Sequence, residues 1–353
     1  MPILLKLLLS PFSILYGLIT FVRNKLYDFH ILSSKSFNLP VINAGNISAG
    51  GTGKSPLIEL LIRILQKENI KVATLSRGYG RKTKGFYLAT KNSTAQTIGD
   101  EPLQFYHKFD GITVSVCENR VKGIEKLLRL QPSPQCILLD DAYQHRRVKP
   151  GLNILLTDYS KLYIYDSMLP SGRLREFPVG ANRADIIIIT KAPENISEEE
   201  KQALAHRHRT KKHQEVFVSF ISYGNLIPIF KNQTIKMSDL NHTKVLLFTG
   251  IANATPLENY LKKHCAEVVS MRFSDHHLYT INDIKQIIQK FHNFADDNNM
   301  IITTEKDIIR LVHHADIDML NQIPLYYIPI EMDFAPQDYH LFEQKILHYV
   351  RKN

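Results

Sequence analysis

The chain has 353 residues, of which 44% are hydrophobic and 22% charged, and its formal net charge is +10. This composition excludes intrinsic disorder, and the length allows two domains. The three cysteines lie far apart in the sequence, which argues against a disulfide framework or a cysteine-based zinc site, and the body of the chain is expected in the cytosol. The positive charge favours an anionic partner, but it does not distinguish nucleic acid, a phosphorylated substrate and an anionic membrane.

The amino-terminal segment is almost entirely apolar from residue 2 to residue 22. The residues that interrupt the apolar pattern recur every three or four positions and are Lys6, Ser10, Ser13, Gly17, Thr20 and Asn24. A narrow polar stripe on an apolar helix predicts an interfacial helix over residues 1–28, lying in the membrane surface with one face wet. A spanning helix and a buried helix remain open, whereas a signal peptide is disfavoured because no small-x-small cleavage site precedes Arg23.

A glycine-rich segment follows a short apolar run and leads into a helix-patterned stretch. Its central residues, which are expected to surround a phosphate chain, are Ser48, Ala49, Gly50, Gly51, Thr52, Gly53, Lys54 and Ser55. In such a loop the backbone N–H groups point at one anion, the lysine reaches the outer phosphates, and the Ser55 hydroxyl can hold Mg²⁺. Ser48 stands where the general pattern has glycine, but strand, loop and helix occur in the required order.

Short apolar strands alternate with helical stretches after this loop. The expected strands are 72–75, 112–116, 136–139, 153–156 and 185–190. This rhythm predicts a parallel sheet with helices on both faces, a P-loop NTPase-like core over residues 29–215. Two extended runs, 216–222 and 226–230, flank Tyr223-Gly224-Asn225 and predict a hairpin, so a two-stranded connector is placed at 216–240. A smaller α/β lobe is placed at 241–353, and its last helix, from about Gln337, is left free to pack on either lobe.

The densest basic stretch, residues 206–213, contains no aromatic residue that could stack on bases, and the chain carries no recognised nucleic-acid module. The stretch is therefore expected to be a solvated helix face, and no nucleic-acid partner is predicted.

Carboxylates at strand ends are candidates for the metal site. Asp140 and Asp141 follow the strand 136–139, and such an adjacent pair repels unless a cation lies beside it. Asp158 follows the strand 153–156 in the same way, so spacing alone leaves it as a competitor.

Transfer of a phosphoryl group to an alcohol also needs a base near the acceptor hydroxyl. Asp100 is a candidate, although an aspartate before Glu-Pro is equally suited to cap a helix. His276 is a candidate partner that relays the proton. Arg77, Arg81, Arg120 and Arg173 lie after strands or in loops, where guanidinium groups can neutralise phosphate oxygens.

With these residues identified, the chain resembles the tetraacyldisaccharide 4'-kinase family of lipid A assembly in Gram-negative bacteria. The resemblance spans nearly the whole chain, and Ser48 is itself typical of that family. The segments that carry it are GNISAGGTGKSP (45–56), SRGYGRK (76–82), GDEP (99–102), ENR (118–120), LLDDAYQHRR (138–147), LPSGRLRE (169–176), ITK (189–191), FTGIANA (248–254), FSDHH (273–277) and TTEKD (303–307).

The resemblance implies transfer of the γ-phosphate of ATP to the 4'-hydroxyl of a membrane-bound tetraacyldisaccharide 1-phosphate. It places the enzyme at the cytoplasmic face of the inner membrane, in contact with inner-leaflet lipid, as a peripheral or monotopic protein. It implies that Asp100 is the base with His276 as its partner and that Asp140 and Asp141 hold Mg²⁺ with Ser55. It further implies that Lys54 holds the triphosphate and that His145 and Arg173 grip phosphate near the reacting centre.

Two other hypotheses stay open on the residues alone. One keeps ATP and Mg²⁺ but takes a different membrane-bound sugar or polyprenyl alcohol as acceptor. The other is a membrane switch that hydrolyses ATP only to change partners, which would need no acceptor base.

Overall fold

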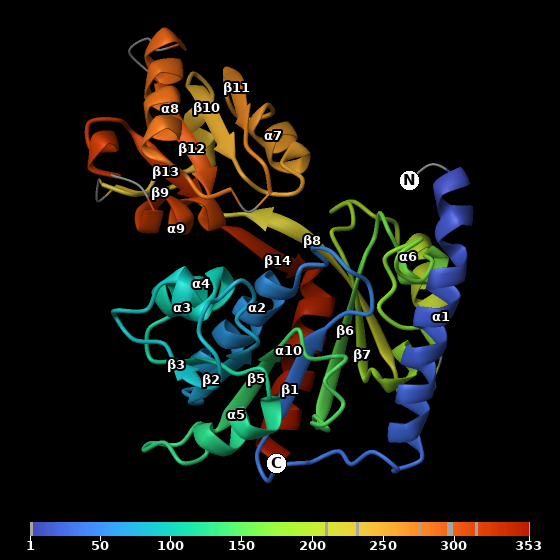
Figure 1. Ribbon diagram of the computed structural model, residues 1–353. Coiled ribbons are helices and arrows are strands. Elements are labelled where there is room, and N and C mark those ends of the chain that lie inside the picture. The colour runs from blue at the N-terminus through green and yellow to red at the C-terminus, as the bar shows by residue number, and fades with distance from the viewer. Residues whose placement is uncertain are drawn as a thin grey trace.

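The computed structural model describes residues 3–208, 211–230, 233–275, 277–294, 299–314 and 317–352. They form a larger and a smaller α/β lobe, with a long helix beside the larger one (Figure 1). The larger lobe contains a sheet in the order β14-β8-β7-β6-β1-β5-β2-β4-β3. Its strands are β1 (Val41–Gly45), β2 (Val72–Ser76), β3 (Tyr87–Leu88), β4 (Thr113–Val116), β5 (Cys136–Asp140), β6 (Leu152–Asp158), β7 (Ile186–Thr190), β8 (Glu215–Tyr223) and β14 (Ile330–Phe334). All neighbours are parallel except at the edges, where β3 and β14 run antiparallel.

Helices cover both faces of this sheet. Side chains alternate along a strand, so Ile42 points to the face covered by α2 (Lys54–Lys67) and α10 (Pro336–Lys352), while Val41 points to the face of α5 (Arg120–Leu127). The remaining helices of this lobe are α3 (Ala95–Ile98), α4 (Asp100–Lys108), α6 (Glu198–His208), η1 (Tyr163–Tyr165) and η2 (Pro178–Arg183). The predicted parallel sheet, buried on both sides, is confirmed.

The smaller lobe has its own sheet and core. Its strand order is β11-β10-β12-β13-β9. The elements are β9 (Ile227–Pro228), η3 (Met237–Leu240), β10 (Lys244–Thr249), α7 (Thr255–Leu261), β11 (Glu267–Arg272), α8 (Ile281–Phe294), β12 (Asn299–Thr304), α9 (Glu305–His314), η4 (Ile317–Leu320) and β13 (Leu325–Ile328). Val245 and Leu247 of β10 pack with α7, whereas Leu246 and Phe248 pack with α8 and α9 on the opposite face.

Two antiparallel strands connect the lobes, but they are not the pair predicted. β8 pairs with β14, from Tyr223 opposite Ile330 to Ser219 opposite Phe334. The expected hairpin between 216–222 and 226–230 is wrong, because β9 pairs with β13 in the smaller sheet. The chain therefore passes from the larger sheet to the smaller one at Gly224, between β8 and β9.

The smaller lobe is consequently inserted between β8 and β14. After β14, α10 returns to the larger lobe, where Phe342 and Ile346 are fully buried in its core. The smaller lobe predicted at 241–353 is therefore too long at its end, because β14 belongs to the larger sheet. The last helix, which the sequence left free to pack on either lobe, packs on the larger one.

The basic stretch near residue 206 is not a simple solvated face. α6 ends at His208, which is fully buried, with its ring in edge contact with Tyr163. Residues 209 and 210 lie outside the described part of the chain.

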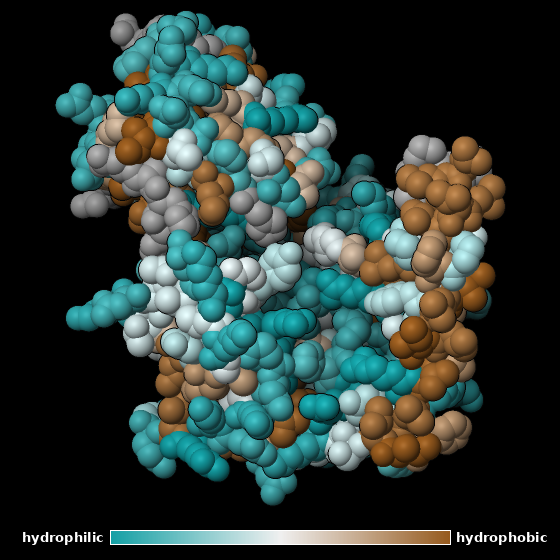
Figure 2. All heavy atoms as spheres, viewed as in Figure 1, coloured by the Kyte–Doolittle hydropathy of each residue, from teal (hydrophilic) through white to brown (hydrophobic). Residues whose placement is uncertain are grey.

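In the long helix α1 (Ile3–Asp28) the polar stripe is turned toward the protein from Ser10 to Asn24, so the expectation of a wet stripe is wrong there, while Lys6 is exposed. The Ser13 hydroxyl donates to Ser171 Oγ at 2.7 Å, and a side chain at Gly17 would strike the ring of Phe177. On the opposite face apolar side chains follow the length of the helix, and Figure 2 shows them as brown atoms with some pale atoms between them. The members of this apolar face, each more than half exposed, are Leu4, Leu7, Leu8, Phe12, Ile14, Leu15, Leu18 and Ile19. By length and composition, with a mean hydropathy of 1.8, α1 could also cross a membrane.

Candidate active site

The glycine-rich loop runs from the end of β1 to the start of α2. Gly50 and Gly53 have φ values of 111° and 86°, which a residue with a Cβ atom rarely adopts. The loop is backed by a second segment, because the Ala49 N–H donates to the Arg173 carbonyl and the Arg175 N–H donates to the Ile47 carbonyl, both at 2.7 Å. The loop thus leads into the first turn of α2, where the N–H groups of Lys54 and Ser55 begin the helix and form an anion site.

The backbone at Ser48 explains why serine can replace the glycine of the general phosphate-loop pattern at this position. Ser48 forms an antiparallel bridge with Leu174, and it is not among the described residues with positive φ, so no glycine is needed there. Further on, the Thr52 side chain accepts from the Asn46 amide at 2.7 Å, and the Thr52 carbonyl accepts from the Thr190 hydroxyl at 2.9 Å. These bonds fix the loop against β7 and the end of β1.

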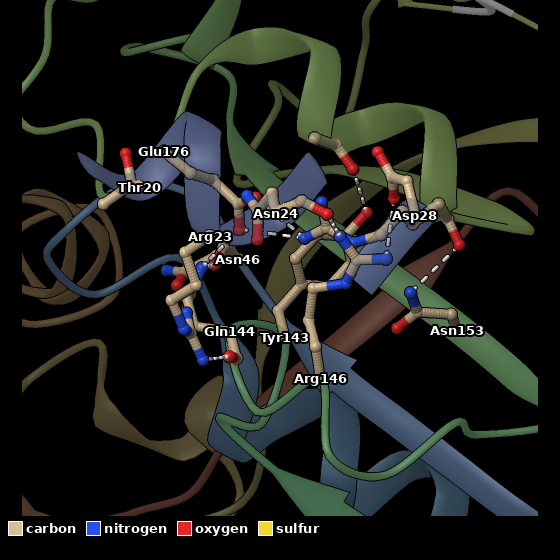
Figure 3. Close-up of polar contacts among 12 residues, drawn as sticks. Thr20, Arg23, Asn24, Asp28, Asn46, Tyr143, Gln144, Arg146, Asn153 and Glu176 are labelled. Atoms are coloured by element: carbon tan, nitrogen blue, oxygen red, sulfur yellow. Dashed lines mark hydrogen bonds and ion pairs between the residues drawn. The ribbon is translucent and has the colours of Figure 1, made fainter. Parts of the chain in front are cut away.

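The loop is also joined to α1 (Figure 3). Glu176, which is 2% exposed, accepts from the Asn24 amide at 2.7 Å and from the Gln144 amide at 3.0 Å. The same Gln144 amide nitrogen donates to the Asn46 carbonyl at 2.8 Å, and Arg146 donates to the Asn24 carbonyl at 2.6 Å. A continuous chain of hydrogen bonds therefore leads from the apolar helix to the residue that opens the loop.

Asp140 and Asp141 lie beside the loop because β5 pairs directly with β1. Burial, together with the charges of Glu101 and Asp141, raises the pKa of Asp140 to about 8. Asp141 has a φ of 50° and accepts from Arg175 Nη1 at 3.0 Å, and its Oδ1 lies 3.7 Å from Lys54 Nζ. Cations thus neutralise Asp141, whereas Asp140 Oδ1 is buried with no hydrogen-bond donor in the described part of the chain.

Glu101 is a site residue that the sequence argument missed. Its Oε1 accepts from the Ser55 hydroxyl at 2.8 Å and from Lys306 Nζ at 3.0 Å. Burial alone would raise the pKa of Glu101, but the charge of Lys306 and the Ser55 bond outweigh it and hold the pKa at about 2. The one sequence feature that could have identified Glu101 is its position next to Asp100 in the GDEP segment, but nothing in the sequence indicates that an acid there contacts the loop.

These groups fit a magnesium ion. The buried, unpartnered oxygen of Asp140 and the Ser55 hydroxyl are hard oxygen groups of the kind that Mg²⁺ prefers. No three carboxylate, imidazole or thiol groups converge on one point within the described ranges. Mg²⁺ commonly takes one or two carboxylates from a protein and completes its shell with water and phosphate oxygens.

Asp100 begins α4, immediately after Gly99, whose φ of 92° and ψ of 160° only glycine tolerates well. Its Oδ2 accepts from Arg310 Nε at 3.0 Å, a contact from the smaller lobe. The predicted partner His276 lies outside the described residues, while its neighbour His277 bonds Asp283 at 3.0 Å.

His145 follows the two aspartates and is surrounded by arginines. Burial, followed by the charges of Arg120 and Arg77, lowers the pKa of His145 to about 4, so the ring is neutral at pH 7. Arg120 is 1% exposed, and its Nε and Nη2 have no acceptor among the residues described. This cluster is suited to an anion.

Three of the other predicted residues, Arg173, Arg81 and Asp158, have structural partners. The Arg173 guanidinium lies 2.8 Å from Asp166 Oδ2, so its contribution to the loop in this structure comes from its carbonyl. Arg81 pairs with Glu118. Asp158, the competing metal ligand, accepts from Lys191 Nζ at 2.8 Å and from Ser160.

A parallel sheet, a phosphate-binding loop with its lysine and serine, and an acid pair on the adjacent strand define a P-loop phosphotransferase. The family model of the tetraacyldisaccharide-1-P 4'-kinases matches residues 5–351 of this chain. The chain belongs to this family, which confirms the resemblance, and it is an ATP-dependent glycolipid kinase that uses Mg²⁺.

Individual relatives agree along the whole length. The chain is 44% identical over 355 residues to a tetraacyldisaccharide 4'-kinase of Bacteroides thetaiotaomicron, covering 98% of this chain and 93% of that protein. It is 46% identical over 351 residues to the enzyme of the same name from Flavobacterium johnsoniae, covering 99% and 98%. The crystal structure of LpxK from Aquifex aeolicus in complex with ATP is similar at a TM-score of 0.73 and 26% identity, covering 98% of this chain and 99% of that one.

Proposed function

We propose that the protein transfers the γ-phosphate of ATP to the 4'-hydroxyl of tetraacyldisaccharide 1-phosphate at the cytoplasmic face of the inner membrane, with Asp100 as the base. The observation that carries the assignment is the convergence of two acidic segments on the loop. Glu101 accepts a hydrogen bond from the Ser55 hydroxyl at the start of α2. Asp100, the first residue of α4, is its neighbour in sequence and therefore lies close to the residues proposed to hold metal and phosphate.

The charged groups divide between donor and metal. Lys54 and the first turn of α2 would hold the outer phosphates of ATP, and Asp140 with Ser55 would hold Mg²⁺, which when bound would neutralise phosphate charge. Asp141 keeps the Lys54 ammonium near the loop, with Asp141 Oδ1 3.7 Å from Lys54 Nζ. The buried Arg120 guanidinium, next to neutral His145, binds a phosphate oxygen of a substrate.

Asp100 accepts the proton of the acceptor hydroxyl as that oxygen attacks phosphorus. A base at this position raises the rate because the hydroxyl becomes a stronger nucleophile as the bond forms. As the family resemblance implies, His276 takes the proton onward from Asp100.

The helix α1 provides the acceptor with its route to the site. Its exposed apolar face enters the lipid surface while its polar face remains bonded to the protein, as in a monotopic anchor. The lipid substrate then reaches the site without leaving the membrane, and the net charge of +10 favours anionic headgroups.

The test is turnover with ATP and the disaccharide lipid in mixed micelles, followed by mass spectrometry of the product. We expect a gain of one phosphate on the distal sugar. We expect Asp100→Asn to lower kcat by roughly a hundredfold or more while ATP binding persists. Asp110→Asn, at an exposed turn after α4, is the matched control.

Two outcomes would contradict the proposal. Wild-type turnover of Asp100→Asn would exclude this residue as the base. Phosphorylation of a polyprenyl alcohol instead of the disaccharide, or ATP hydrolysis without any phosphorylated lipid, would support one of the two hypotheses left open by the residues.

A further inference from the structure

The two lobes meet along a polar seam between α4 and α9. Three ion pairs of this seam show that the two helices run antiparallel, and the Gln104 amide also donates to Glu305 at 3.1 Å. Asp100 at the start of α4 pairs with Arg310, Glu101 pairs with Lys306, and Lys108 at the end of α4 pairs with Glu305 at 2.9 Å. The acids at the first turn of α4 and the cations on α9 are thus matched one to one.

We infer that Arg310 is a positioning residue for Asp100, and that the smaller lobe thereby fixes the direction of the catalytic carboxylate. The inference rests on the proposed role of Asp100 as the base. Lys306, four residues earlier on the same face of α9, holds the neighbouring acid Glu101 in the same manner.

Arg310 is built as a rigid support. Its side chain is 1% exposed, and Nη1 donates to the Gly250 carbonyl at 3.0 Å and lies 3.6 Å from Asp307 Oδ1. Asp307 is itself fixed, because it accepts from the Gly250 N–H at 3.0 Å and from the Thr304 hydroxyl at 2.6 Å. The guanidinium is therefore oriented by its own lobe, and little conformational entropy remains to be lost when Nε meets Asp100.

Asp100 needs such a partner more than an ordinary surface acid does. Catalysis requires the carboxylate to point at one hydroxyl, and a misplacement of about 1 Å can cost on the order of a hundredfold in rate. Asp100 is next to Glu101, a like charge, so its preferred direction without Arg310 would be away from that neighbour. A charged hydrogen bond at 3.0 Å fixes one oxygen, Oδ2.

The contact also couples the base to the arrangement of the lobes. Arg310 belongs to α9, and α9 moves with the smaller lobe. Any separation of α9 from α4 breaks the hydrogen bond between Arg310 and Asp100. Asp100 is therefore oriented by Arg310 only while the two lobes are in contact.

The experiment compares Arg310→Gln, Arg310→Lys and the double variant Arg310→Gln/Asp100→Asn of the full chain. The control is Arg272→Gln, which removes an exposed pair with Glu258 in the same lobe. We expect Arg310→Gln to lower kcat about tenfold or more with the KM for ATP nearly unchanged, and Arg310→Lys to recover part of the loss. The double variant should be no slower than Asp100→Asn alone, since Arg310 acts through Asp100.

Hydrogen exchange provides a readout independent of catalysis. The backbone amides of Glu101, Leu103 and Gln104 at the start of α4 should exchange faster in Arg310→Gln than in the wild type or in Arg272→Gln. Unchanged exchange with unchanged kcat would overturn the inference, as would losses from Arg310→Gln and Asp100→Asn that multiply. Full activity of Asp100→Asn would instead refute the proposed base, and the exchange result would show separately whether the contact exists.

Discussion

Replacing Leu8 of α1 by serine should weaken binding of the protein to lipid vesicles roughly 5- to 30-fold. Leu8 is 71% exposed on the apolar face of α1 and makes little contact with the body of the protein. Complete burial of a leucine side chain is worth about 1.5–3 kcal/mol, so the exposed part contributes about 1–2 kcal/mol when it enters lipid. Each 1.4 kcal/mol corresponds to about a tenfold change in the binding constant, which gives the predicted range.

The assay is flotation of the protein with vesicles of phosphatidylethanolamine and phosphatidylglycerol. Leu341→Ser is the matched control, because Leu341 is a partly exposed leucine on α10 of the larger lobe, 46% accessible. Nucleotide binding, measured in parallel, should be unchanged in both variants. Adding Leu15→Ser to Leu8→Ser should multiply the loss, since the two side chains act independently.

Equal recovery of the Leu8→Ser and Leu341→Ser proteins with vesicles would refute the assignment of this face to lipid. Deletion of residues 1–25 should also reduce recovery and turnover on vesicle-borne glycolipid. That deletion is less specific, because it removes the Asn24 amide from buried Glu176 as well as the apolar surface.

Two further outcomes are expected. Asp140 keeps its proton up to about pH 8, and Mg²⁺ must displace that proton, so the affinity for Mg²⁺ with a non-hydrolysable ATP analogue should rise between pH 6 and 8 and then level. Calorimetric titration should show this slope in the wild type and lose it in Asp140→Asn. Gly99→Ala should lower the melting temperature more than Gly53→Ala. Both substitutions place a Cβ at positive φ, but at Gly99 it would also lie 2.8 Å from the Tyr79 carbonyl oxygen.

Local sequence was sufficient for the parts of the fold and site that are continuous in the chain. The loop and the start of α2 follow from one glycine-rich segment, and Asp140 follows from a strand that ends in two acids. Such features depend on neighbours in sequence, so periodicity and spacing predict them.

The missing parts depend on partners that are distant in sequence. Glu101 is separated by 205 residues from Lys306, and Asp100 by 210 from Arg310, so no local pattern distinguishes these acids from a helix cap. The hairpin prediction failed for the same reason. The pattern of apolar residues predicts that β8 is a strand, but it does not show that β8 pairs with the distant strand β14. The polar stripe of α1 was misassigned since hydroxyl groups that face Ser171 look, in sequence, like groups that face water.

The return of the chain through β14 and α10 has a consequence for biosynthesis. These last elements supply an edge strand and buried side chains to the larger sheet, whereas every strand of the smaller sheet precedes residue 329. On the ribosome, where folding proceeds from the amino terminus, the inserted lobe can complete its core while the catalytic one still lacks its final strand and helix. The core around α2, to which Met332 of β14 contributes, is therefore completed only after the smaller lobe has formed.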